Sequence, residues 1–258
     1  MKIKIYRVMI ALITGICVIA GLYINVFGNR WPSGSRDILV SSGNNTRSVK
    51  KDTGNFKKIN IDTQIFDVSI SAGTGYSYVY TCSDDRMVPE VNLADGVLTV
   101  KQKEEFQISP FGWMGHNKAA LSVTVPSGVQ LDSIEISGSV GDTKITGVSS
   151  DSIKVDGSVG DVDVTDSAAG RLVCDSSVGD CTVTDSTVGS CSIDTSTGDI
   201  NIGIKGDKKG YSYDLDTSTG DVEVDGKKYD DDDVPEGSGK NRINAHTSVG
   251  DINISFCN

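Results

Sequence analysis

Residues 139–145 read Ser-Val-Gly-Asp-Thr-Lys-Ile, and close variants of this heptapeptide recur along the second half of the chain. The shared tetrapeptide Ser-X-Gly-Asp stands at 139–142, 158–161, 177–180, 196–199, 218–221 and 248–251. Its glycine returns three times after 19 residues, and then after 22 and 30 residues. A unit that recurs at a long, nearly constant period is typical of a protein built by stacking similar structural units.

Apolar and polar residues alternate on both sides of each copy. The trio that follows each Gly-Asp begins and ends with the pairs Thr143/Ile145, Val162/Val164, Cys181/Val183, Ile200/Ile202, Val222/Val224 and Ile252/Ile254. A second pair lies seven and five residues before each glycine: Ile134/Ile136, Ile153/Val155, Leu172/Cys174, Cys191/Ile193, Tyr213/Leu215 and Ile243/Ala245. Alternation with a period of two indicates strands that bury one face.

These patterns predict an all-β fold, a β-solenoid whose coils of about 19 residues each hold two short strands. We place the repeat solenoid at residues 129–258, as a flattened two-sided stack with consecutive coils about 4.8 Å apart. Glycine permits a positive φ at each turn, and the adjacent Asp and Ser can bond local backbone N–H groups. The predicted structural turn residues are Gly141, Asp142, Gly160, Asp161, Gly179, Asp180, Gly198, Asp199, Gly220, Asp221, Gly250 and Asp251.

Stacking would align the aspartates of the motif in one column and Asp156, Asp175, Asp194 and Asp216 in a second. Columns of this kind hold calcium in nonapeptide β-rolls. Those rolls use a Gly-Gly-X-Gly-X-Asp turn, whereas glycine and aspartate are adjacent here. We therefore expect the aspartates to cap turns, and we expect no metal and no other cofactor. A calcium-binding β-roll is the minor alternative.

Residues 56–128 are expected to form an irregular β portion that caps or starts the same stack. The turn Asp95-Gly96 stands between two alternating segments and predicts a hairpin. Large apolar residues are concentrated in the segment 104–118, which we consider a candidate interaction loop; a lid over the open end of the core is the other interpretation. These residues are Phe106, Phe111, Trp113 and Met114.

The N-terminus predicts a membrane anchor. Residues 8–28 carry no charge and would span about 30 Å as a helix, enough for a bilayer. A cleaved signal peptide is the rival interpretation, although its apolar region should be shorter, about 7–15 residues. The basic residues within 1–7 place that tail in the cytoplasm. We thus expect a single-pass membrane protein with an extracytoplasmic solenoid, joined to its anchor by a flexible linker at residues 29–55.

Composition excludes some functions. The chain has 35 acidic and 24 basic residues and a net charge of −11, which argues against nucleic acid as a partner. The two histidines, His116 and His246, stand in no recognisable catalytic spacing, so we predict no catalytic residues and no enzyme. No Cys-X-X-Cys occurs. We expect the inward cysteines 174, 181 and 191 to behave as small apolar residues, with a disulfide as the alternative.

Three features together resemble a bacterial family known as the "putative adhesin" domain of unknown function. They are the opening Phe56-Lys-Lys-Ile-Asn-Ile61, the step Ser122-Val-Thr-Val-Pro126 and the run of Ser/Thr-X-Gly-Asp-Ile/Val-X-Ile/Val repeats. The resemblance implies a membrane-anchored, non-catalytic binding or structural module of the cell envelope, with an envelope protein or glycan as partner. Some relatives are accessory proteins of envelope-stress signalling systems, and this role is the alternative function.

Overall fold

The computed structural model describes residues 47–83, 85–102, 119–229 and 237–257. Within these ranges the chain is built almost entirely of β-strands, which confirms the predicted all-β class. The predicted anchor, residues 8–28, lies outside them. None of the helices in the described ranges is long and apolar enough to cross a membrane.

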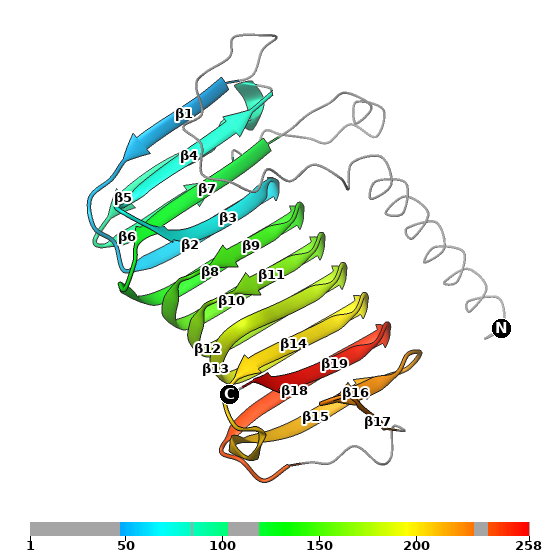
Figure 1. The fold of residues 1–258 in the computed structure, drawn as a ribbon. Coiled ribbons are helices and arrows are strands. Elements are labelled where there is room, and N and C mark those ends of the chain that lie inside the picture. The colour runs from blue at the N-terminus through cyan, green and yellow to red at the C-terminus, as the bar shows by residue number, and fades with distance from the viewer. Residues whose placement is uncertain (1–46, 84, 103–118, 230–236, 258) are drawn as a thin grey trace, which may run out of the picture. The chain divides into compact units, whose positions relative to one another are not determined.

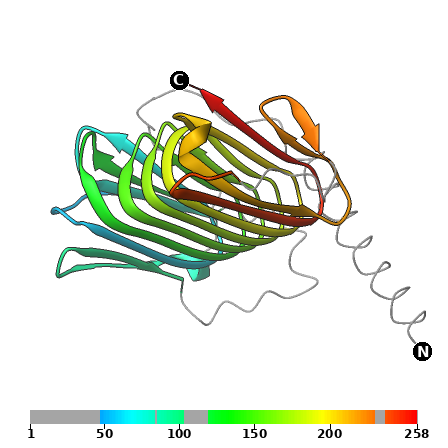
Figure 2. The same ribbon diagram turned by 90° about the horizontal axis from the view of Figure 1, so that it is seen from below.

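Each coil of the repeat region gives one strand to each of two sheets, named sheet A and sheet B (Figure 1). Sheet B holds β8 (Gln130–Val140), β10 (Ser149–Val159), β12 (Ala168–Val178), β15 (Tyr211–Thr217) and β18 (Asn241–Val249). Sheet A holds β9 (Thr143–Thr146), β11 (Val162–Thr165), β14 (Ile200–Lys205), β16 (Val222–Val224) and β19 (Ile252–Cys257). The long strand β13 (Cys181–Thr197) runs through both sheets. All of these strands pair in parallel with the equivalent strands of neighbouring coils. Figure 2 shows the successive coils lying side by side along the stack.

Residues 56–73 contribute a regular coil rather than an irregular cap. Strand β2 (Lys58–Ile65) pairs with β8, and β3 (Asp67–Gly73) pairs with β9, both in parallel. On their other side lie β6 (Val97–Lys101) and β7 (Ala119–Pro126). Antiparallel partners follow: β5 (Glu90–Ala94) on β6 and β4 (Ser77–Cys82) on β7, with the short helix η1 (Asp85–Met87) between them in the chain. The predicted Asp95-Gly96 hairpin is confirmed, with φ of 50° and 74° at these two residues.

One part of the predicted linker is ordered. Residues 47–52 form strand β1 (Arg47–Asp52), which pairs antiparallel with β4 at the margin of sheet A. The prediction of a flexible segment up to residue 55 was therefore wrong for these residues. Lys50 and Lys51 are exposed on this outermost strand, where lysine discourages further strand pairing. Because this segment is polar, its sequence does not show the alternation of apolar and polar residues that predicts a strand.

The coils do not stack in chain order at the C-terminal side. Strand β18 pairs with β13 on one side and with β15 on the other, and β19 lies in the same way between β14 and β16. The last coil of the chain is thus inserted between the two coils that precede it. The expectation that consecutive coils are neighbours was wrong here. A hairpin of β16 with β17 (Lys227–Tyr229) and the short helix η3 (Lys208–Gly210) complete this end of the stack.

The core is a narrow column between the two sheets. Each pair that alternation assigned to the interior is buried, except that Tyr213, in the outermost coil, is half-buried. Parallel register places equivalent residues in contact from coil to coil, as in Ile134, Ile153, Leu172 and Cys191. Burial of these aliphatic side chains is the main stabilising contribution, because every coil covers the apolar faces of its neighbours.

Candidate functional site

The Ser-X-Gly-Asp turns lie along one edge of the stack, which we name the turn edge. Their glycines have φ between 139° and 159°, a range that side-chain-bearing residues rarely adopt. A Cβ on Gly160 would also overlap the carbonyl oxygen of Gly141, and the same overlap recurs at each coil. Glycine is therefore required twice, by its own dihedral angle and by the close approach of the next coil.

The aspartates of the motif form a ladder between coils. In each coil the backbone N–H of the aspartate donates to Oδ1 of the aspartate in the neighbouring coil, so the capping links coils rather than acting locally as expected. The ladder starts at Asp67, in the coil where Phe66 replaces glycine. Its hydrogen bonds run from Asp142 to Asp67 (3.2 Å), Asp161 to Asp142 (3.0 Å), Asp180 to Asp161 (2.9 Å), Asp199 to Asp180 (2.8 Å), Asp251 to Asp199 (2.8 Å) and Asp221 to Asp251 (2.8 Å).

Electrostatics oppose this arrangement at its centre. Partial burial raises the pKa of Asp161, and the carboxylates of Asp142, Asp180 and Asp163 raise it further. The N–H of Asp180 lowers the pKa of Asp161, because a carboxylate is stabilised by a donated hydrogen bond. The ladder thus balances repulsion between carboxylates against the hydrogen bonds that they accept.

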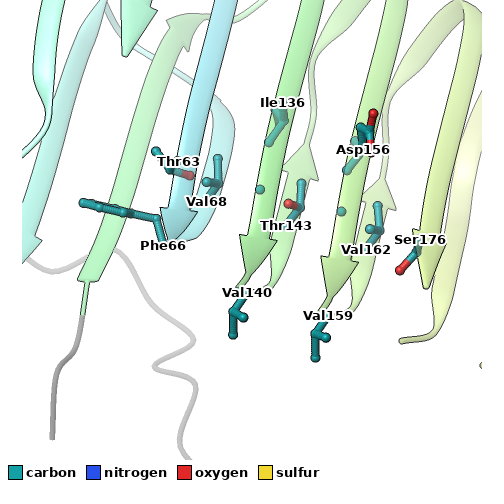
Figure 3. Close-up of a pocket in the computed structure, with 15 residues that line it drawn as sticks. Thr63, Phe66, Val68, Ile136, Val140, Thr143, Asp156, Val159, Val162 and Ser176 are labelled. Atoms are coloured by element: carbon teal, nitrogen blue, oxygen red, sulfur yellow. The ribbon is translucent and has the colours of Figure 1, made fainter. Parts of the chain in front are cut away.

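The other two positions of the motif face solvent. All six serines are exposed, and within the described ranges no hydrogen bond from their hydroxyls is present. The expected capping by serine was therefore wrong, because the strand of sheet B continues through this position and turns the side chain outward. Val159 and Val249, at the X position, are 36% and 44% exposed. Figure 3 shows Val140 and Val159 pointing away from the stack.

A small cavity of about 20 Å³ lies inside the turn edge (Figure 3). It opens where Gly138 and Gly157 stand in register, because neither supplies a side chain at a position that other coils fill. Thr63 and Ser176 give it two polar walls, and apolar side chains such as Val68 and Ile136 give the others. The volume accommodates about one water molecule. This cavity is too small for an organic ligand.

The outer face of sheet B carries the second predicted acidic column, with one change. Asp156, Asp175 and Asp194 are in register, but His246 of the inserted coil stands between Asp194 and Asp216. Its Nδ1 lies 3.2 Å from Oδ1 of Asp194. Burial, followed by the charges of Asp194 and Asp156, raises the pKa of Asp175, and Lys154 lowers it. Sequence reasoning missed the histidine because its coil is displaced.

The outer face of sheet A presents a continuous line of hydroxyl groups, which we name the hydroxyl row. Parallel register aligns one residue from each of five neighbouring coils or strands, in the order Thr124, Ser71, Thr146, Thr165 and Thr184. Beside this row runs a second outward column, in which Ser69 Oγ lies 2.8 Å from Ser122 Oγ and is followed by Lys144 and Asp163. Beyond the end of the row, Asn253 Nδ2 donates to Asn201 Oδ1 over 3.1 Å. Register therefore fixes polar groups at a repeat of about 4.8 Å.

The cysteines in the described ranges are free thiols. Cys174, Cys181 and Cys191 are buried in the core, as predicted. Burial raises the pKa of Cys191 to about 12 and that of Cys82 to about 11, so both thiols are protonated at neutral pH. The pKa of Cys181 is also raised, first by its hydrogen bond with Cys174 and then by burial. These groups act as apolar side chains.

Phe106, Phe111, Trp113 and Met114 lie outside the described residues. The candidate interaction loop therefore stays a prediction. Among the side chains that the structure does describe, no group of three or more His, Cys, Asp or Glu is arranged to hold a metal ion.

The Toastrack DUF4097 family model matches residues 56–189 and again residues 127–255. The chain belongs to the Toastrack DUF4097 family. This membership confirms the resemblance found in the sequence, and the two overlapping matches agree with a chain that repeats one structural unit.

One solved structure with a TM-score above 0.5 shares the fold. A "putative cell adhesion protein" from Clostridium sporogenes is 16% identical, with a TM-score of 0.54, and the alignment covers 82% of this chain and 100% of the other. A "putative adhesin" from Bacteroides fragilis is 14% identical, with a TM-score of 0.46, and 82% and 97% are covered. No curated protein matches the chain. At these identities the similarity concerns the fold alone.

Proposed function

We propose that this Toastrack protein is a non-catalytic, adhesin-like binding module of the cell envelope, held at the membrane by residues 8–28 with the solenoid outside the cell. The hydroxyl row is the observation that carries the proposal. Its groups are fixed by register, as binding surfaces built on rigid elements are. Repeated hydroxyls at a constant spacing suit a polymer whose own hydrogen-bonding groups repeat, and an envelope glycan has this chemistry.

The motif residues themselves are already engaged in stacking. Glycine and aspartate of each turn contact the neighbouring coil, so the repeat sequence is accounted for by structure. Binding is then left to the outward residues of the strands, which differ between the two faces. The outer face of sheet B is acidic around Asp175, whereas the hydroxyl row is uncharged. The row itself is uncharged, and the cation of Lys144 stands beside Asp163 next to it, so this face repels anionic envelope polymers less than the acidic face of sheet B does.

The binding test uses the full chain in detergent and insoluble cell-wall glycan from a Gram-positive bacterium. Thr165→Arg places a bulky side chain within the hydroxyl row, between Thr146 and Thr184. Ser192→Arg is the matched control, because Ser192 points outward from the opposite face, in sheet B. We expect the unaltered protein and Ser192→Arg to be retained on the glycan, and Thr165→Arg to be lost. Equal retention of both variants, or no retention of any, would refute a binding role for this face.

Membrane topology is tested separately. Protease added to intact cells after wall removal should digest an epitope at the C-terminus, and the anchor should remain in the membrane fraction. Full protection of the epitope, or a soluble form that begins near residue 29, would contradict the proposed topology. A deletion strain distinguishes the accessory role in envelope-stress signalling: a changed stress response with unchanged attachment would favour that alternative.

A further inference from the structure

The last coil of the chain is inserted between two other coils, and we name the position that it fills the slot. Strands β18 and β19 fill the space between β13–β14 and β15–β16, and each has a parallel partner on both sides. The coil of β15 and β16 reaches the rest of the stack through this last coil, apart from contacts such as the hydroxyl of Tyr211, which donates to the carbonyl of Val188 over 2.7 Å. Removal of β18 and β19 would therefore leave two open parallel edges in each sheet, on β13 and β15 in sheet B and on β14 and β16 in sheet A.

The inserted coil and the coils on either side of it have nearly the same sequence around their turns. Residues 195–202 read Thr-Ser-Thr-Gly-Asp-Ile-Asn-Ile, residues 247–254 read Thr-Ser-Val-Gly-Asp-Ile-Asn-Ile, and residues 217–224 read Thr-Ser-Thr-Gly-Asp-Val-Glu-Val. Their contacts repeat as well: Thr247 Oγ1 donates to the carbonyl of Gly198 over 3.1 Å, and Thr217 Oγ1 donates to that of Gly250 over 2.9 Å. Each coil recognises its neighbour by backbone ladders and turn contacts that any identical coil can make.

We propose that the C-terminal coil, residues 241–257, is exchanged between copies of this chain, so that one copy fills the slot of another. Every contact that the coil makes within one molecule is available between two, which makes exchange of an identical element a low-cost route to association. Gly237 pairs with Ser212, and the N–H of Gly239 donates to the carbonyl of Tyr211 over 3.2 Å, so these residues would be exchanged together with the coil. The connection that precedes them favours the closed monomer by its effective concentration, and this advantage falls when many copies are crowded together. The occupant of the slot is a second copy, and the proposal does not depend on the proposed glycan binding.

Disulfide trapping tests the exchange, because Asn201 and Asn253 are register partners in β14 and β19. Full-length chains carrying Asn201→Cys or Asn253→Cys are co-expressed, each with Cys17→Ser and Cys257→Ser, so that the native cysteines that remain are the buried ones. The copper phenanthroline complex serves as the oxidant, at low and at high density of the protein in lipid vesicles. The double variant, with both cysteines in one chain, is the control for geometry and should yield an intramolecular disulfide.

We expect the co-expressed single variants to form a disulfide-linked dimer that neither forms alone, and whose fraction rises with protein density. Monomers only, in the presence of an efficient intramolecular disulfide in the double variant, would overturn the proposal. A third variant pairs Asn201→Cys with Glu223→Cys, residues that both pair with Asn253 and so stand two coils apart. An intramolecular disulfide in that variant would mean that β16 can stack directly on β14 with the last coil displaced, and it would overturn exchange in favour of rearrangement within one chain.

Discussion

The carbonyl oxygen of Gly141 occupies the place that a Cβ on Gly160 would need. This close approach explains why the turn tolerates one residue type, and it sets the spacing between coils along the turn edge. Gly157, three residues earlier in the same coil, borders the small cavity, and a Cβ added there would meet no atom within 4 Å. Two glycines in one coil thus have opposite roles, one required and one dispensable.

Gly160→Ala and Gly157→Ala should consequently change stability in opposite directions. We expect Gly160→Ala to lower the free energy of unfolding by about 1–3 kcal/mol or more, from backbone strain and overlap. Gly157→Ala should raise it by about 0.4–1 kcal/mol, because the unfolded chain loses conformational freedom and the added Cβ meets no other atom. Chemical denaturation of both variants beside the unaltered protein measures the difference. A loss of stability in both would show that the space at Gly157 is needed.

The aspartate ladder predicts a second matched pair. Asp180→Ala removes the acceptor of the N–H of Asp199 and should lower the free energy of unfolding by about 1–2 kcal/mol. Asp180→Asn keeps an oxygen at the same place and relieves repulsion from neighbouring carboxylates, so it should cost less than half as much. If the two variants melt at the same temperature, the charge of Asp180 matters and its hydrogen bond does not.

At the scale of the strand, alternation decides what each residue tolerates. Val164 of β11 is 1% exposed, whereas its neighbour Asp163 points outward from sheet A. Val164→Asp should lower the free energy of unfolding by several kcal/mol, because an unpaired carboxylate would be buried. Asp163→Asn should change it by less than about 0.5 kcal/mol, as surface substitutions usually do. Thermal melting of both variants can be followed by circular dichroism. Equal changes in melting temperature would show that the faces of the strand are assigned wrongly.

Charge along neighbouring strands of sheet B gives a pH dependence. Asp175 of β12 faces Asp156 of β10, Asp194 of β13 and the cation of Lys154, and its folded pKa lies above the ordinary value of 3.8. A raised carboxyl pKa contributes stability below the unfolded pKa, and this contribution is lost as the pH rises through the folded pKa. Asp175→Asn should therefore raise the melting temperature at pH 7.

The same comparison at lower pH provides the control. Near pH 3 Asp175 is protonated in both states, so the melting temperatures of Asp175→Asn and the unaltered protein should converge. A difference that persists unchanged from pH 7 to pH 3 would attribute the effect of the substitution to packing rather than to charge.

Strand positions and faces could be predicted from the sequence because side-chain burial with a period of two leaves a direct trace in it. Pairs such as Ile134/Ile136 and Ile252/Ile254 were assigned to the interior and are buried. Coil order left no such trace. Residues 195–202 and 247–254 are nearly identical, so each is an equally good neighbour for the other coils, and only the three-dimensional structure shows which one is inserted. The position of His246 beside Asp194 was hidden for the same reason.

For the whole molecule, the ladder predicts that folding does not require calcium. In each coil one carboxylate oxygen accepts a hydrogen bond from the backbone N–H of the neighbouring coil, so the ladder links the coils without a bridging cation. Circular dichroism in excess chelator should keep the full β-sheet signal and the same melting temperature. Loss of that signal, restored by added calcium, would show that the aspartate column is a metal site.

The double-sided pairing of the last coil has a mechanical consequence. A force that pulls on the C-terminus acts along β19, which is held by parallel hydrogen bonds to β14 on one side and to β16 on the other. Removing β19 must break the ladders on both of its sides, whereas removing the edge strand β1 breaks only its ladder with β4. The chain therefore resists tension applied at its C-terminal end more strongly than tension that peels β1 from the other end. Because the last coil is inserted one place inward, it cannot leave the stack without breaking hydrogen bonds to a coil on each side.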